Sequence, residues 1–248
     1  EKTTLNAIAE GPEYSIAVGD RGLITAIARD ITPIGTIKKV GDGSIKSIAH
    51  GQDIFIAATG GSSLLSSKNG IDWQYQPLPL DIGVNAVRYN EGLWTAVGEL
   101  GVVFTSTDSL SWTAHRSSTN EPLNDIAGQS GLWIAVGNSL TIIQTKNFQS
   151  WESTAFPRVR GSNQSHLVSI ENHGETWIAV GDRGIMLKST DGTNWESLNP
   201  SRFSTSWSKI KFLNSRWWAL GVKNCCTPIM IQSEDEGETW QAIELPQH

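Results

Sequence analysis

Arginine is the residue type in this sequence that most clearly offers binding chemistry. Six of the nine arginines lie in polar segments between short apolar runs. Arg21 and Arg183 each follow an aspartate and precede a glycine. The longer polar segments hold Arg116, Arg158, Arg160, Arg202 and the aromatic Phe203. The guanidinium group is a planar fork that fits carboxylate, phosphate or sulfate. These residues predict a surface for an anionic partner, although the two Asp-Arg pairs could equally be surface turns whose charges pair locally.

Residues for catalysis or metal binding are not grouped in a recognisable way. The sequence has no G-x-S-x-G, H-E-x-x-H or paired C-x-x-C motif, and its five histidines show no metal-ligand spacing. Asp20, Glu99 and Asp182 could supply a carboxylate pair for glycoside cleavage, but acidic turn residues are common in an acidic chain. We therefore expect no catalytic residue, no metal site and no cofactor.

The two cysteines, Cys225 and Cys226, are adjacent. Neighbouring Cα atoms lie about 3.8 Å apart across a trans peptide, which is below the usual range of a disulfide, so a bridge between them would be strained. An oxidising compartment would favour the bridge because each cysteine has no other partner. A reducing compartment would favour two free thiols, and the sequence leaves both states open.

Composition narrows the class of protein and of partner. The net charge is −6 without a basic cluster, which argues against a nucleic-acid surface. No run of 18 apolar residues occurs, so we expect no membrane-spanning segment. The start at Glu1, without a methionine, is explained most simply by processing or trimming and does not settle localisation. We expect a secreted or periplasmic protein. We expect it to be a monomer.

A tryptophan repeat reveals the elements that must position these residues. Trp73, Trp112, Trp151, Trp195 and Trp240 follow one another at intervals of 39, 39, 44 and 45 residues. Each closes a unit of four short runs that are rich in β-branched residues and bounded by Gly, Asn, Asp and Ser, which indicates strands. A second strand ends at a glycine in most units, 14 residues before the tryptophan.

Six such units account for nearly the whole chain. The predicted repeats cover residues 4–43, 44–82, 83–121, 122–165, 166–205 and 206–248. Their first strands begin with Leu5–Ile8, Ile45–Ile48, Val84–Val87, Leu123–Ile126, Leu167–Ile170 and Trp207–Ile210. Four strands per repeat of about 41 residues are typical of a β-propeller blade. The sequence therefore predicts an all-β fold in one domain, residues 1–248. This domain is a six-bladed β-propeller of four-stranded antiparallel blades, each made of whole consecutive strands.

The turn before each tryptophan resembles a known repeat. Ser189-Thr190-Asp191-Gly192-Thr193-Asn194-Trp195 and Ser233 to Trp240 look like the Asp-box, or BNR, repeat of sialidases, photosystem II assembly factors and secreted bacterial propellers. The turn with Asp108 is a looser copy, and the first unit lacks the motif. The chemistry of this turn is structural: Asp108, Asp191 and Asp235 should accept hydrogen bonds from amides of their own turns. The tryptophans should pack the turns onto the blades.

The resemblance implies two kinds of function. A sialidase would need a tyrosine nucleophile, but Tyr14, Tyr75 and Tyr89 fall in or beside predicted strands, away from the segments that vary in length. Photosystem II assembly factors are non-enzymatic propellers whose arginine patch holds a partner protein. Our leading interpretation is therefore a scaffold that binds a protein or anionic partner through variable, arginine-rich loops. The alternative is a carbohydrate-binding protein or a glycoside hydrolase of the sialidase-like class.

Loop lengths place that surface. The length of the chain varies in two kinds of connection: from a fourth strand to the next first strand, as between Trp151 and Leu167, and from a second strand to a third, as between Val222 and Pro228. In a four-stranded antiparallel blade both kinds lie at the same end. Loops that vary on a constant scaffold commonly bind partners.

Overall fold

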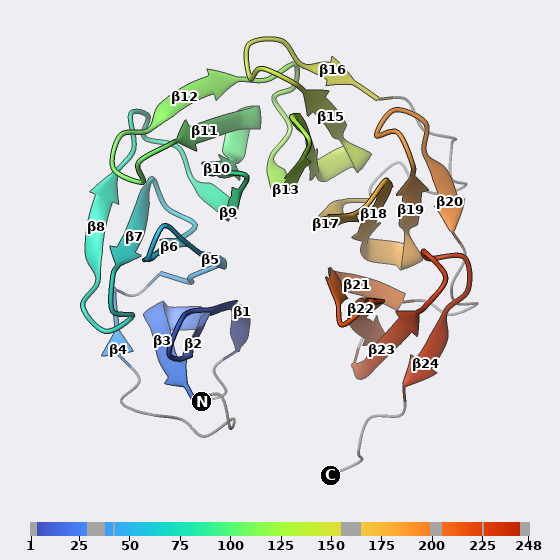
Figure 1. Ribbon diagram of the computed structural model, residues 1–248, viewed down its shortest axis with the longest axis horizontal. Helices are drawn as coiled ribbons and strands as arrows, with labels where there is room; N and C mark the ends of the chain where they lie inside the picture. The colour runs from blue at the N-terminus through green and yellow to red at the C-terminus, as the bar shows by residue number, and fades with distance from the viewer. Residues whose placement is uncertain are drawn as a thin grey trace. The chain divides into compact units, whose positions relative to one another are not determined.

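The computed structural model describes residues 4–28, 38–41, 43–154, 165–198, 205–224 and 226–243. Its strands form six four-stranded antiparallel sheets, each built from four consecutive strands (Figure 1). The fold is the predicted six-bladed β-propeller, and every sheet of the described chain is a whole blade. The described chain contains no α-helix.

The chain divides into two compact units, Glu1–Pro122 and Leu123–His248, with three blades in each. The single-domain assignment stays a prediction. In unit 1, blade 1 consists of β1 (Leu5–Glu10), β2 (Ser15–Gly19), β3 (Leu23–Ile27) and β4 (Lys38–Lys39). Blade 2 consists of β5 (Ser47–Gly51), β6 (Ile54–Ala58), β7 (Ser63–Ser67) and β8 (Gln74–Pro77). Blade 3 consists of β9 (Val84–Asn90), β10 (Leu93–Gly98), β11 (Val102–Ser106) and β12 (Thr113–Arg116).

Unit 2 repeats this order. Blade 4 consists of β13 (Leu123–Gln129), β14 (Leu132–Gly137), β15 (Ile142–Thr145) and β16 (Glu152–Ser153). Blade 5 consists of β17 (Leu167–His173), β18 (Thr176–Gly181), β19 (Met186–Ser189) and β20 (Glu196–Leu198). Blade 6 consists of β21 (Thr205–Leu213), β22 (Arg216–Lys223), β23 (Thr227–Ser233) and β24 (Gln241–Ile243). Short 3-10 turns join second to third strands in four blades: η1 (Asp20–Gly22), η2 (Glu99–Gly101), η3 (Asn138–Leu140) and η4 (Asp182–Gly184).

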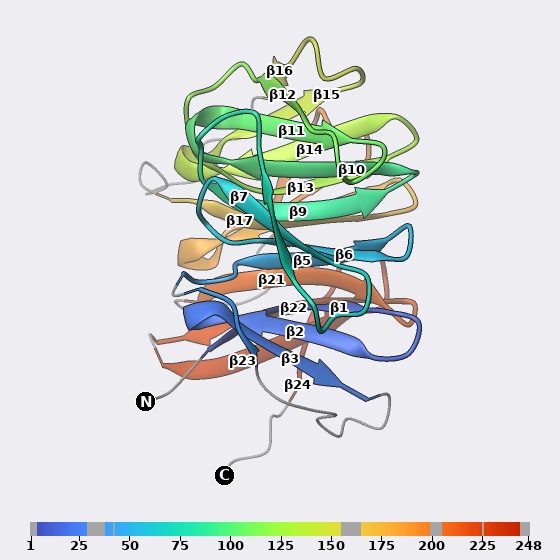
Figure 2. The ribbon, with the colours of Figure 1, turned by 90° about the vertical axis from the view of Figure 1, so that its left-hand side faces the viewer.

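Hydrophobic clusters between successive blades hold each unit together. In unit 1, Ile16 and Val18 of β2 share a cluster with Phe55 and Leu65 of blade 2. Within each unit the first strands of successive blades are neighbours, as β5 and β9 are in Figure 2. In unit 2, one cluster joins blades 4 and 5 and another joins blades 5 and 6. Apolar burial is the main favourable term in folding, so each blade is stabilised by the blades beside it.

The glycine that ends a second strand is required by space. A Cβ at Gly19, Gly98 or Gly181 would lie about 2 Å from the carbonyl oxygen of the residue just before the first strand of the same blade. These glycines have extended backbone, so the close approach and not the φ angle selects them. The recurring glycine of the sequence thus marks where the chain entering a blade crosses the end of its second strand.

Three details differ from the sequence prediction. β5 begins at Ser47, two residues after the predicted start at Ile45, whose backbone N–H donates to the oxygen of Gly19 in blade 1. β21 begins at Thr205, inside the predicted fifth repeat. The insertion between Val222 and Pro228 lengthens β22 and β23 into a longer hairpin, because Val222 pairs with Pro228 and Lys223 with Thr227.

Candidate functional site

The connections between second and third strands are tight turns with an unusual backbone. Arg21, Leu100 and Arg183 have φ angles of 57°, 56° and 52°, and the glycines that follow them also have positive φ. Two central residues with positive φ are the mark of a type I′ hairpin turn, whose twist matches that of the strands. We call the end of the blades that carries these turns, together with the links from fourth to first strands, the turn end.

Carboxylates at the turn end are engaged in their own blades. The Oδ1 atom of Asp20 accepts hydrogen bonds from Asn6 Nδ2 at 3.0 Å and from Ser44 Oγ at 2.8 Å. These hydrogen bonds, that of Asn6 first, lower the pKa of Asp20, so this carboxyl remains ionised. Glu99 Oε1 accepts from Asn85 Nδ2 at 3.2 Å, and Asp182 Oδ1 accepts from the backbone N–H of His166 at 2.9 Å.

The asparagines in these contacts were missed by the sequence reasoning. Asn6 and Asn124 lie at β-bulges near the start of their first strands, where one extra residue interrupts the pairing register. A bulge turns a side chain out of the regular alternation. Asn124 Nδ2 thereby reaches both Asn138 Oδ1 and the carbonyl of Leu167 in the next blade. The signal in the sequence is an asparagine 14 residues before an acid or amide.

The arginine side chains of the turn end are exposed. In unit 1, Arg21 lies in η1, and Arg116 ends β12, where it is the register partner of Val102. The backbone N–H of Ser117 donates to the oxygen of Gly101 at 3.3 Å, which ties this segment to η2. In unit 2, Arg183 occupies the same turn position as Arg21. The predicted residues Arg158, Arg160, Arg202 and Phe203 lie outside the described residues.

The cysteine prediction is not settled by the described residues. Cys226 is exposed at the tip of the β22–β23 hairpin. Cys225 lies outside the described residues. The adjacent bridge therefore stays a prediction.

The turns before the tryptophans are held by internal hydrogen bonds. Asp191 Oδ1 accepts from the backbone N–H groups of Thr193 and Asn194 at 2.8 and 2.7 Å and from Ser189 Oγ. These bonds, chiefly that from Asn194, lower the pKa of Asp191 to about 2. Hydrogen bonds within their own turns likewise lower the pKa values of Asp108 and Asp235 to about 2. These carboxylates are thus engaged in structure.

Three of the five tryptophans are hydrogen-bonded to a glycine of the turn that precedes them. The indole N–H groups of Trp73, Trp195 and Trp240 donate to the oxygens of Gly70, Gly192 and Gly237. The corresponding turns of Trp112 and Trp151 have Ser109 and Phe148 at positive φ, and the indole nitrogens of these two tryptophans are buried without a partner among the described residues. All five tryptophans directly precede the fourth strands of their blades.

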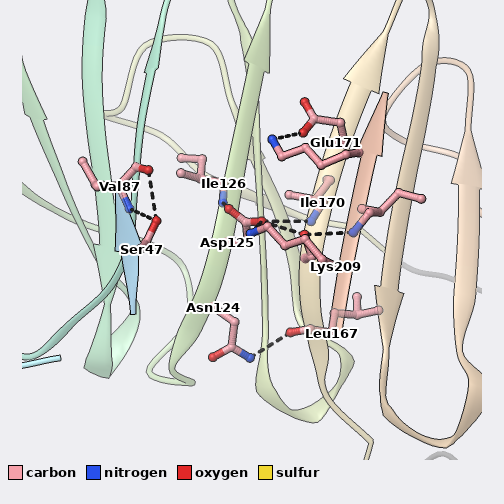
Figure 3. A network of polar contacts seen from close by, with 12 residues as sticks. Ser47, Val87, Asn124, Asp125, Ile126, Leu167, Ile170, Glu171 and Lys209 are labelled. Carbon is pink, nitrogen blue, oxygen red and sulfur yellow. Dashed lines mark hydrogen bonds and ion pairs between the residues drawn. The ribbon is translucent and has the colours of Figure 1, made fainter. Parts of the chain in front are cut away.

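A buried polar network joins the first strands of unit 2 (Figure 3). Asp125 is 1% exposed, and its Oδ2 accepts from Ser169 Oγ at 3.0 Å and from the backbone N–H of Ile170 at 3.3 Å. Lys209 Nζ lies 3.5 Å from the same oxygen. In unit 1, Ser47 Oγ exchanges hydrogen bonds with the backbone of Val87 in the next blade. In the sequence, the sign of these polar contacts is a polar residue at the third position of a first strand that is otherwise apolar.

A polar groove of about 430 Å³ lies between the outer parts of blades 4 and 5. Its lining includes Gln144, Glu152, Asp191 and Thr193. Gln144 Nε2 donates to both Glu152 Oε2 and Thr193 Oγ1 at 3.3 Å, whereas its Oε1 atom is buried without a partner among the described residues. Leu132 is the single apolar residue among the described lining residues, which include no aromatic ring to serve as a stacking platform for a sugar.

Two further properties of the described residues bear on chemistry. No group of three or more His, Cys, Asp or Glu in these ranges could hold a metal ion. No helix long and apolar enough to span a membrane occurs in the part of the chain that the structure describes.

Comparison with known proteins identifies the fold and not a family. No protein-family model and no curated protein sequence matches this chain. Among solved structures, YCF48 bound to D1 peptide is 17% identical, with a TM-score of 0.73 over 97% of this chain and 80% of that chain. Virginiamycin B lyase from Staphylococcus aureus is 10% identical, with a TM-score of 0.81 over 98% of this chain and 85% of that chain.

A third similar structure is the WD40 β-propeller domain of Doa1, at 13% identity and a TM-score of 0.77 over 99% of this chain and 83% of that chain. At these identities the likeness shows a shared propeller fold. Since one fold carries many functions, a function has to be argued from the residues of the site.

Proposed function

We propose that this chain is a non-enzymatic scaffold that binds an acidic protein segment at the turn end of its blades. The observation that carries the proposal is the exposure of arginine side chains at this end of the blades. In unit 1 the side chains of Arg21 and Arg116 are exposed, and in unit 2 that of Arg183 is exposed. Asp20 and Glu99 accept hydrogen bonds from Asn6 and Asn85. A guanidinium that faces solvent can pair with a carboxylate of a partner through its planar fork of N–H donors.

The similar structures support a protein partner. One of them is YCF48 bound to D1 peptide, and another is the WD40 propeller domain of Doa1. The five tryptophan turns, which we assign to the Asp-box class on their hydrogen bonding, are a scaffold feature in this proposal. A secreted or periplasmic location and a monomeric state remain part of it as predictions.

The carbohydrate alternative has less support. The described lining of the groove between blades 4 and 5 lacks an aromatic platform, and the Asp191 carboxylate in it is held by its own turn. A virginiamycin B lyase shares the fold, so the fold by itself does not exclude an enzyme. A glycan array separates the classes: specific, saturable binding of a sugar would favour the alternative.

Charge reversal at the turn end tests the proposal. The probe is a fluorescently labelled ten-residue peptide of glutamate and serine, titrated at low and high salt. Arg21→Glu and Arg116→Glu should each weaken binding about three- to tenfold and reduce its salt dependence, because each removes one charge pair. Both variants should keep the wild-type melting temperature, since exposed charges add little stability.

Arg216→Glu is the matched control. Arg216 is partly exposed at the start of β22, away from the turn end, and pairs with Glu234 at 2.7 Å. This variant should bind the peptide like the wild type. Equal binding by all four proteins, or equal weakening by all three variants, would overturn the proposal, because binding would then not depend on the turn end.

A further inference from the structure

Leu100 is a strained and exposed leucine at the turn end of unit 1. Its side chain is 60% exposed, and its backbone lies in the left-handed region with φ 56° and ψ 26°. It is the first central residue of the η2 turn, the position that Arg21 and Arg183 occupy in their blades.

Leucine is a poor choice for this backbone. Steric contact between Cβ and the following carbonyl disfavours the left-handed region for most residues, and turns of this type prefer asparagine or glycine there. No burial compensates for the strain at Leu100, because most of the side chain faces water. Stability therefore gives no reason for leucine at this place, and strain of this kind is often kept for function.

The segments around Leu100 carry one exposed cationic side chain, Arg116, and one carboxylate, Glu99, that is hydrogen-bonded. Two residues further on, Val102 pairs with Arg116, whose side chain is exposed. The neighbouring Glu99 is hydrogen-bonded to Asn85, and Asn85 also accepts from Lys46 Nζ at 2.7 Å. The backbone N–H of Ser117 also donates to the oxygen of Gly101, so the segments that carry the exposed Leu100 and the exposed Arg116 are adjacent.

We infer that Leu100 and Arg116 together form an anchor for a partner segment in which an apolar side chain stands next to an acidic one. The apolar side chain would cover Leu100, and the carboxylate would pair with Arg116. This inference rests on the proposed function and specifies the chemistry of its partner. A few exposed residues commonly supply most of the affinity of such an interface.

Two labelled ten-residue peptides with equal numbers of glutamates test the anchor. One peptide carries leucines between the glutamates, and the other carries serines at the same places. The wild-type protein should bind the leucine peptide about tenfold more tightly, because covering apolar area adds affinity. Leu100→Asn should remove this preference and leave binding of the serine peptide unchanged.

The variant keeps the turn, since asparagine suits the left-handed region, so its melting temperature should not fall. Leu110→Asn is the matched control. Leu110 is also an exposed leucine, but it lies in the turn before Trp112, at the opposite end of blade 3, and its loss should leave the preference intact.

The outcomes separate the inference from the proposed function. Equal affinity of the wild type for the two peptides would overturn the anchor, and so would an unchanged preference in Leu100→Asn. The proposed function would still hold in either case if charge reversal at Arg21 and Arg116 weakened binding. If the wild type bound neither peptide, the anchor and the proposed function would both be wrong. Loss of the preference in Leu110→Asn would also overturn the anchor, because the effect would then not be local.

Discussion

The buried carboxylate of Asp125 gives the most direct test of how the blades of unit 2 are joined. Asp125→Ala would remove the carboxylate that accepts from the hydroxyl of Ser169 and from the backbone N–H groups of Ile126 and Ile170. Each orphaned buried group costs about 1–3 kcal/mol. Lys209 would lose its ionic partner, but about 35% of its side chain is exposed and water can solvate it.

We therefore expect Asp125→Ala to lower the free energy of unfolding by about 3 kcal/mol, the lower end of the cost of breaking a buried ion pair. For a chain of this length the melting temperature should fall by roughly 6–12 °C. Urea unfolding followed by tryptophan fluorescence measures the change. Asp125→Asn should cost less, because an amide oxygen can still accept from Ser169.

A surface control and a double variant test this prediction further. Asp81→Ala, which removes an exposed carboxylate from a loop of unit 1, should change stability by less than about 0.5 kcal/mol. The double variant Asp125→Ala with Ser169→Ala should cost less than the sum of the two single variants, because the two residues share one hydrogen bond. A loss under about 1 kcal/mol in Asp125→Ala would refute the view that this network locks the first strands together.

Two further predictions concern the tryptophan turns. Trp195 is 4% exposed within the cluster that joins blades 4 and 5, so Trp195→Ala should cost about 3–5 kcal/mol in urea unfolding. A loss under about 1 kcal/mol would contradict its packing role. Asp108, Asp191 and Asp235 have pKa values of about 2 in the folded chain, against an ordinary value of 3.8. Their lowered pKa stabilises the fold above about pH 4, and this contribution should be lost as the pH falls from about 4 to about 2. The urea midpoint of Asp191→Asn should fall less steeply over this range than that of the wild type, and parallel curves would refute the assignment.

The sequence by itself was enough for the architecture. The tryptophan period, the recurring glycine and the short β-branched runs predicted six blades of four strands, because each repeat carries the same turn and the same faces to bury. The type and the order of the strands could therefore be predicted from the sequence, whereas the residues at which the strands begin could not. β5 begins two residues later than predicted, and Ile45 instead bonds to Gly19 of another blade, a contact that leaves no local signal.

Only the tertiary structure could assign roles to the polar residues. Asp20 and Asp125 look alike in the sequence. Asp20 accepts a hydrogen bond from Asn6, 14 residues away, which lies at a bulge of the first strand. Asp125 also lies at a bulge, but it is buried and accepts from Ser169 in the first strand of the next blade. The exposure of Leu100 was likewise visible only in the tertiary structure, since the sequence Glu99-Leu100-Gly101 does not show whether the leucine side chain is buried. Periodicity encodes which surfaces a repeat must bury, but hydrogen bonds between repeats depend on contacts that form only when the blades pack.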